Sequence, residues 1–123
     1  MKVGIISGGF DPIHSGHISY IQAAKQACDF LIVGVNSDAW LKRKKGRSFM
    51  PFSERIAIIK AMHDVNYATE FDDYDNTAFD LVERAAIMFP DAHLIFMNGG
   101  DRTEDNIPEM KLAEEADFEV EFM

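Results

Sequence analysis

Two histidines with a serine and a glycine between them stand near the start of the chain, in the segment Gly8-Gly9-Phe10-Asp11-Pro12-Ile13-His14-Ser15-Gly16-His17. The apolar run before this segment predicts a buried strand, and apolar residues at helical spacing after it predict a helix that begins at Gly16. A glycine-rich turn between a strand and a helix offers backbone N–H groups and the positive end of a helix dipole to an anion. Two imidazoles beside such a turn can donate hydrogen bonds to the same phosphate. The pattern therefore indicates chemistry on a nucleotide.

A basic segment follows the second predicted strand, and residues 36–47 read NSDAWLKRKKGR. It leaves the sheet at the same edge as the histidine turn, which is where open α/β sheets bind their ligands. Five cations fall within the six residues 42–47, which is enough charge to neutralise a triphosphate. Alone, the segment is more typical of a solvated basic loop. Combined with the histidine turn, it favours a phosphate-binding segment.

Strand-like and helix-like segments alternate along the whole chain. Two of the strands, LIVGV and LIFM, are almost wholly apolar, as expected for parallel strands covered on both faces. The alternation predicts an α/β fold with a five-stranded, mostly parallel sheet and helices on both faces. The predicted strands are 3–7, 30–36, 67–71, 93–97 and 118–122, and the predicted helices are 16–28, 52–63, 77–89 and 108–116.

Length and composition predict one domain, because 123 residues with 47% hydrophobic content can bury a core of ordinary size. No apolar run approaches the roughly 20 residues of a membrane span. The first residues form a strand that leads directly into the histidine turn, so we expect no signal peptide. The one cysteine, Cys28, has no internal disulfide partner. These features predict a cytoplasmic protein without a membrane partner.

The net charge of −9 is unevenly distributed. Residues 1–63 hold nine Lys and Arg against four Asp and Glu, whereas residues 64–123 hold three against seventeen. This distribution predicts a local anion site and disfavours nucleic-acid binding through the basic segment. The acidic stretch 72–75 is interpreted as a solvated loop rather than a metal site.

The motif GGFDPIHSGH resembles the (T/G)xFDxxHxGH signature of the nucleotidyltransferase superfamily, whose fold is Rossmann-like. A hydrogen-bonded histidine at a helix start is the alternative explanation for the histidines alone. The segment NSD…KRKKG resembles the nucleotidyl-transfer domain of bacterial ADP-heptose synthesis, and glycerol-3-phosphate cytidylyltransferases have a comparable lysine-bearing segment. The run GGFDPIH is also similar to nicotinate-mononucleotide and phosphopantetheine adenylyltransferases, whose later motifs fit less well.

This resemblance implies transfer of AMP or CMP from ATP or CTP, with Mg²⁺, to a sugar phosphate or glycerol 3-phosphate, with release of pyrophosphate. It implies His14, His17 and Lys42 as catalytic residues and no metal ligand from the chain. Arg55 matches an arginine at the start of the next helix that relatives present to the nucleotide phosphates or to the acceptor. Asn98 stands where relatives carry lysine or methionine, so the identity of the base stays open. The implied nucleotide-binding residues are Gly8, Gly9, Phe10, Asp11, Gly16, Arg43, Lys44, Lys45, Arg55, Asn98, Gly99 and Asp101.

Relatives continue after their fifth strand into a (G)xST(T) segment that grips the nucleotide phosphates, and residues 1–123 hold no such motif. A natural tail, another chain or an impaired enzyme would each account for this. The alternative function is a non-catalytic nucleotide-binding or regulatory module. Relatives are often dimers. A homodimer is therefore one expectation, with the aromatic residues Trp40, Phe49 and Phe52 as candidates for its interface.

Overall fold

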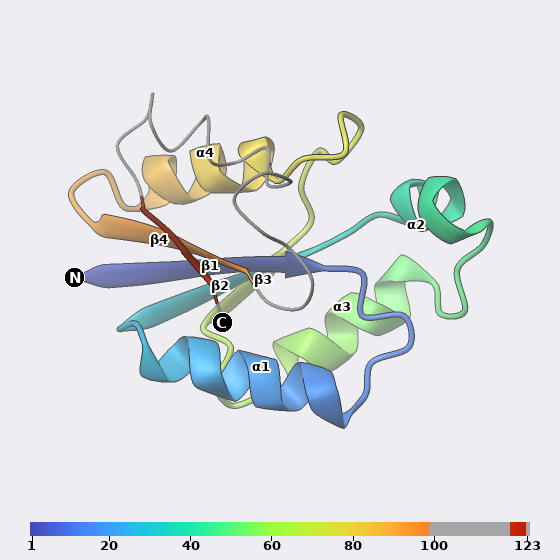
Figure 1. Ribbon diagram of the computed structural model, residues 1–123, viewed down its shortest axis with the longest axis horizontal. Coiled ribbons are helices and arrows are strands. Elements are labelled where there is room, and N and C mark those ends of the chain that lie inside the picture. The colour runs from blue at the N-terminus through green and yellow to red at the C-terminus, as the bar shows by residue number, and fades with distance from the viewer. Residues whose placement is uncertain (99–118, 123) are drawn as a thin grey trace.

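A computed structural model describes residues 1–98 and 119–122 of the chain (Figure 1). Strands and helices alternate through most of it, as the apolar periodicity predicts. The predicted helix 108–116 lies outside the described residues. The elements are β1 (Lys2–Gly8), α1 (Ser15–Gln26), β2 (Phe30–Val35), α2 (Asp38–Lys45), α3 (Phe52–Lys60), β3 (Tyr67–Thr69), α4 (Phe79–Met88), β4 (His93–Asn98) and β5 (Glu119–Phe122).

The five strands form one sheet in the order β3-β2-β1-β4-β5, and all neighbouring strands are parallel. The predicted α/β fold with a parallel sheet is therefore confirmed. From β1 the chain adds β2 and β3 on one side of the sheet, and then β4 and β5 on the other side, so the order of strands reverses between β1 and β4. The carboxyl ends of these two strands flank the point where open α/β sheets bind ligands. The turn after β1 begins at that point.

Helices cover both faces of the sheet, with α1 and α3 on one side and α4 on the other (Figure 1). Successive strand residues point to opposite faces. Thus Ile6 and Val33 pack with Ile21 of α1 and Ile59 of α3, whereas their neighbours join the second core. That second core contains Ile5, Ile32, Phe96 and Leu81 of α4. The two fully apolar cores fix the sheet from which the turn after β1 projects.

The basic segment contains a helix, α2, which is not among the predicted helices. Ser37 caps its start, because the Ser37 Oγ accepts a hydrogen bond from the Trp40 N–H at 3.0 Å. Gly46 ends it in the left-handed conformation, with φ of 88°, and its N–H donates to the Lys42 carbonyl. The helix therefore spreads its cations around its circumference instead of presenting them as one strip.

None of the helices in the described part of the chain has the length and apolar character needed to cross a membrane.

Candidate functional site

His14 and His17 form a reciprocal cap at the start of α1. The His14 Nδ1 accepts a hydrogen bond from the Gly16 N–H at 3.0 Å, and the His17 Nδ1 accepts one from the His14 N–H at 3.1 Å. An Nδ1 that accepts carries no proton, so this hydrogen-bond network assigns the neutral Nε2–H tautomer to both rings. Neither Nε2 donates to a described residue. The ring centroids lie 4.0 Å apart. The cap therefore leaves two adjacent donors available to one ligand.

Gly16 is required by the His14 ring. A Cβ at Gly16 would lie 2.8 Å from His14 Cε1 and 3.0 Å from its Nδ1, which is closer than packed atoms approach. The first turn of α1 also carries no acidic residue. The positive end of the helix dipole is therefore uncompensated beside the two imidazoles, as an anion site requires.

Burial lowers the pKa of His17 below its usual value, and the neighbouring His14 lowers it further. The ring of Phe10 lies edge-on to the His17 ring, with 5.2 Å between their centroids, and Phe10 itself is buried. Phe10 occupies the left-handed backbone region, with φ of 52°, which turns the chain sharply after β1. His17 is therefore held as a neutral hydrogen-bond donor at neutral pH.

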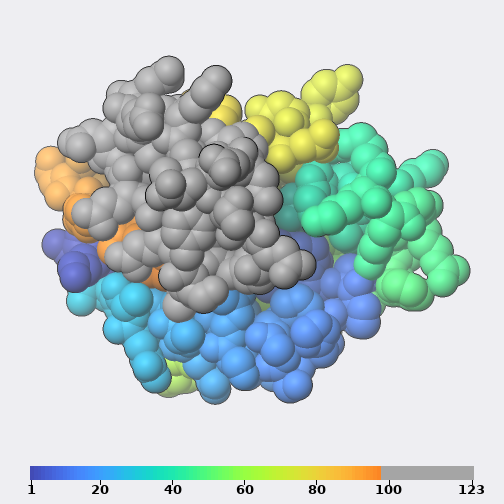
Figure 2. Space-filling model, viewed as in Figure 1, coloured from blue at the N-terminus to red at the C-terminus, as the bar shows by residue number. Residues whose placement is uncertain are grey.

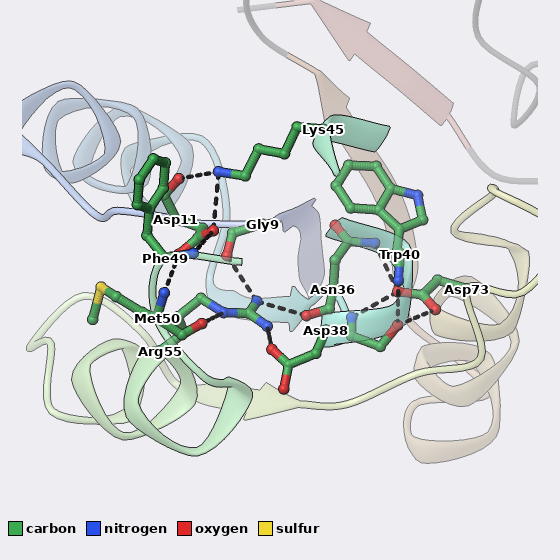
Figure 3. A network of polar contacts seen from close by, with 11 residues as sticks. Gly9, Asp11, Asn36, Asp38, Trp40, Lys45, Phe49, Met50, Arg55 and Asp73 are labelled. Atoms are coloured by element: carbon green, nitrogen blue, oxygen red, sulfur yellow. Dashed lines mark hydrogen bonds and ion pairs between the residues drawn. The ribbon is translucent and has the colours of Figure 1, made fainter. Parts of the chain in front are cut away.

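Asp11 ties the histidine turn to the segment after α2 (Figure 3). Its carboxylate accepts hydrogen bonds from the Phe49 N–H at 2.7 Å and the Met50 N–H at 2.6 Å, and it pairs with Lys45 Nζ at 2.9 Å. Burial by itself raises the pKa of the Asp11 carboxyl, but these hydrogen bonds and the Lys45 charge outweigh it and hold the pKa below its ordinary value. Only 1% of the Asp11 side chain is exposed, so its described contacts are structural.

Arg55 is fully buried, and the expectation that it faces a phosphate does not fit this geometry. Its Nη1 donates to the carbonyls of Gly9 at 2.9 Å and Asn36 at 2.6 Å, beyond the ends of β1 and β2. Its Nε donates to the Met50 carbonyl, and its Nη2 pairs with Asp38 at 2.7 Å (Figure 3). Arg55 therefore holds the two strand ends and the turns beyond them in a fixed relation.

The cations of α2 point to different partners. Arg43 donates through Nη2 to the Asp73 carbonyl at 2.8 Å. Lys44 Nζ lies 4.6 Å from the centre of the Trp40 ring. Lys42 is exposed and makes no hydrogen bond or ion pair with a described residue. Lys45 pairs with Asp11 in the turn after β1. The four cations of residues 42–45, which were expected to bind phosphate together, therefore point in separate directions.

Asp73 is buried, whereas Asp72, Tyr74 and Asp75 are exposed, so the interpretation of residues 72–75 as a solvated loop is wrong at Asp73 alone. One carboxylate oxygen accepts from the Ser37 hydroxyl at 2.8 Å, and the other accepts from the Ser37 N–H at 2.7 Å and the Asn36 side-chain amide at 3.1 Å. A carboxylate at this place also complements the positive end of α2. The loop after β3 therefore fixes where α2 begins (Figure 3).

The backbone of Gly8 and Gly9 continues from β1 toward the histidines. A Cβ at Gly9 would lie 2.8 Å from Leu41 Cδ2, so α2 packs closely against the turn and any side chain at residue 9 would displace Leu41. Asn98 ends β4, next to β1 across the reversal in strand order. Gly99 and Asp101 lie outside the described residues. The structure thus brings the histidine turn, α2 and the end of β4 to one edge of the sheet.

Sequence reasoning missed three residues that organise this edge: Asn36, Asp38 and Asp73. Their partners lie 17 to 37 positions away in the chain, so local patterns carry no signal for them. The helix α2 did have a local signal, because Ser37 and Gly46 are typical helix-start and helix-end residues.

The amino-acid sequence matches known proteins. Residues 5–119 match the family described as "Cytidylyltransferase-like". The chain belongs to this family. The expected resemblance to nucleotidyltransferases is thereby confirmed.

Relatives with the name "Bifunctional protein HldE" are similar in sequence. The protein from Nitrosococcus oceani is 38% identical over 103 residues, which cover 82% of this chain and 20% of the relative. The protein from Syntrophotalea carbinolica is 34% identical over 119 residues, covering 95% of this chain and 23% of the relative. The chain therefore spans about a fifth of the length of these relatives.

Solved structures share the fold of this cytidylyltransferase-like chain. The lipopolysaccharide core biosynthesis protein from Thermoplasma volcanium superposes with a TM-score of 0.77 at 22% identity, covering 100% of this chain and 96% of that one. A putative nicotinate-nucleotide adenylyltransferase from Vibrio parahaemolyticus superposes with a TM-score of 0.68 at 18% identity, covering 98% and 72%. At these identities the likeness establishes the fold alone.

Proposed function

We propose that this chain transfers AMP or CMP from a nucleoside triphosphate to a phosphorylated acceptor and releases pyrophosphate. The observation that carries the proposal is the pair of Nε2–H donors that the α1 cap leaves unpartnered among the described residues. They lie at the start of a helix of 12 residues, at the carboxyl edge of a parallel sheet. Membership of the cytidylyltransferase-like family supports the same chemistry.

The reaction needs positioning and charge stabilisation rather than a covalent enzyme intermediate. An oxygen of the acceptor phosphate attacks the α-phosphorus of the nucleotide in line. The new P–O bond forms as the bond to the bridging oxygen breaks, and pyrophosphate leaves with that electron pair. His14 and His17 donate from Nε2 to the phosphate oxygens on which negative charge gathers, and the helix dipole adds to this stabilisation. Neither histidine has to gain or lose a proton.

Lys42 is the cation of α2 most available to the departing phosphates, because it makes no hydrogen bond, ion pair or ring contact with a described residue. Lys45 must share its charge with Asp11 if it binds phosphate. Mg²⁺ enters as part of the nucleotide substrate, since magnesium in such sites is held largely by phosphate oxygens and water. In the described part of the chain, no three His, Cys, Asp or Glu side chains gather as a metal site.

A pyrophosphate-release screen tests the proposal. ATP and CTP are each combined with a panel of sugar phosphates and with glycerol 3-phosphate, on the full chain and on His14→Asn as the matched control. We expect release with one nucleotide and one acceptor class, and a loss of about 100-fold or more in the variant. Nucleotide binding without release, across the whole panel, would support the alternative of a non-catalytic nucleotide-binding module and overturn the transfer reaction.

A further inference from the structure

The ion pair between Asp11 and Lys45 joins a buried carboxylate to a partly exposed lysine. Only 1% of the Asp11 side chain is exposed, compared with 33% of the Lys45 side chain. Lys45 Nζ pairs with the carboxylate at 2.9 Å and also donates to the backbone carbonyl of Asp11. Figure 2 shows the atoms of α2 and of the segment after it beside the blue atoms between β1 and α1. Lys45 therefore lies on the histidine turn, and part of it stays open to solvent.

The other two partners of the Asp11 carboxylate are backbone groups. The N–H groups of Phe49 and Met50 donate to it at 2.7 Å and 2.6 Å (Figure 3). These two hydrogen bonds do not depend on Lys45, and hydrogen bonds of this kind favour the ionised form of a carboxyl group. The ion pair with Lys45 is therefore the contact that can break while Asp11 keeps its charge and its position.

Lys45 is within reach of the phosphates that the histidine cap would hold. Asp11, whose carbonyl accepts from Lys45, precedes His14 by three residues, so their Cα atoms lie at most about 11 Å apart. A nucleotide whose α-phosphate binds the cap extends its other two phosphates beyond that point. The flexible stem of Lys45 lets the ammonium move from Asp11 toward them.

A phosphate and the Asp11 carboxylate compete for this ammonium. Both are anions, and an ammonium shared between them holds two like charges close together. The repulsion between the two anions favours an exchange, in which Lys45 leaves the carboxylate for a phosphate and returns when that phosphate departs. Asp11 therefore acts as a resident anion that any phosphate bound by Lys45 has to displace.

We propose that Asp11 promotes the release of pyrophosphate by taking Lys45 back after the transfer. The inference rests on the proposed function, because pyrophosphate is the leaving group of that reaction. During the transfer Lys45 stabilises charge on the departing phosphates. Afterwards the Asp11 carboxylate, held in place by the two backbone N–H groups, competes for the same ammonium. Asp11 acts through Lys45 and does not touch the reacting atoms, so it is a positioning residue.

Inorganic pyrophosphate is the probe for the test, titrated calorimetrically into the full chain. Asp11→Asn removes the negative charge and keeps an oxygen that can accept from one of the backbone N–H groups. Lys45→Gln removes the ammonium, and the double variant completes a thermodynamic cycle. Asp80→Asn is the matched control, because the Asp80 carboxylate likewise accepts a backbone N–H, from Asp72 at 2.8 Å, and pairs with Arg84 at 2.8 Å. Thermal unfolding checks that each variant folds.

We expect Asp11→Asn to bind pyrophosphate about tenfold more tightly than wild type, because Lys45 no longer has to leave an ion pair. The gain should disappear in the Lys45→Gln background, and Asp80→Asn should stay within about twofold of wild type. Equal tightening with and without Lys45 would show direct repulsion by Asp11. Unchanged or weaker binding would show that the carboxylate does not compete for Lys45. Each of these two results overturns the proposal.

A measurement on the wild type decides the question if Asp11→Asn does not fold. The NMR chemical shift of the Asp11 carboxyl carbon responds to the loss of its lysine partner. Pyrophosphate should move this signal in the direction in which Lys45→Gln moves it without pyrophosphate, and a signal that pyrophosphate leaves in place would overturn the proposal. Failure of the proposed function is read separately, as an absence of pyrophosphate release with every nucleotide and acceptor, because these titrations measure binding alone.

Discussion

The backbone N–H of His14 donates to the Nδ1 of His17 at 3.1 Å, so the two side chains that would bind phosphate also cap the helix that carries them. This relation couples the fold to the chemistry. Each Nδ1 is an acceptor in the cap, and each Nε2 is the donor that remains. A proton added at either Nδ1 would break a capping hydrogen bond. The cap and the two Nε2–H donors therefore occur together only while the rings are neutral.

His14→Asn separates capping from phosphate binding. Asparagine is a favourable N-cap residue, so its Oδ1 can accept from the Gly16 N–H while the Nε2 donor is lost. We expect an unfolding temperature close to wild type and a loss of turnover of about 100-fold to 1,000-fold. His14→Ala should lose turnover similarly and also about 1 kcal/mol of stability, because the cap is gone. Near-normal steady-state rates in a folded His14→Asn variant would remove this histidine from the mechanism.

Gly16→Ala tests the fit of the His14 ring against the helix. Alanine is a better helix former than glycine by up to about 1 kcal/mol, which favours the variant's helix. Its Cβ would approach His14 Cε1 at 2.8 Å, so the ring has to move and the paired donors are separated. We expect a folded protein whose kcat falls at least about tenfold. Circular dichroism and steady-state kinetics measure both effects, and a fully active variant would contradict the described position of the ring.

Acid should destabilise the fold through His17. Its pKa in the folded protein lies below the ordinary 6.5, so between these two values the unfolded chain binds more protons than the folded one. The contribution of His17 to stability is complete above pH 6.5 and is lost as the pH falls toward the lowered pKa. Urea unfolding at pH 7.5, 6.5 and 5.5 measures this loss. His17→Asn, which keeps an acceptor for the cap, should show a smaller decrease than wild type, and equal decreases would exclude His17 as the group responsible.

Arg55→Lys should cost about 3–5 kcal/mol of unfolding free energy. The lysine keeps the charge but cannot donate at once to the carbonyls of Gly9, Asn36 and Met50, which would be left buried without partners. Arg84→Lys is the control, because the Arg84–Asp80 ion pair on α4 is partly exposed and contributes less than about 1 kcal/mol. Chemical denaturation measures both. A cost below about 1 kcal/mol for Arg55→Lys would show that the strand ends do not depend on this side chain.

Replacement of the α2 lysines tests triphosphate binding. We expect Lys42→Ala to weaken ATP and CTP binding more than Lys45→Ala, because Lys45 already shares its charge with Asp11. Rising salt should weaken nucleotide binding in the wild type and less so in the double variant. Calorimetric titration at two salt concentrations measures these affinities, with Lys60→Ala as the control. A nucleotide affinity that is unchanged in the double variant would show that neither lysine binds the triphosphate.

The strand, turn and helix from β1 to α1 follow from the sequence alone. The apolar periods, Gly16 between two histidines and the alternation of segments are local patterns, and local patterns determine which elements form and in what order. They predicted a parallel sheet, and the sheet order then places the turn after β1 at the reversal point. The caps of α2 at Ser37 and Gly46 were equally local, so this helix could have been predicted as well.

Only the tertiary structure decided which charges meet. Arg55 is 46 positions from Gly9 and Asp11 is 34 positions from Lys45, and a residue's type does not reveal whether it will be buried against carbonyls or left in water. The burial of Asp73 and the division of the α2 cations depend in the same way on how α2 packs over Gly9. Local sequence specifies the elements because their hydrogen bonds are local. The polar partners at the sheet edge come from distant segments, and they are fixed only when the two hydrophobic cores bring those segments together.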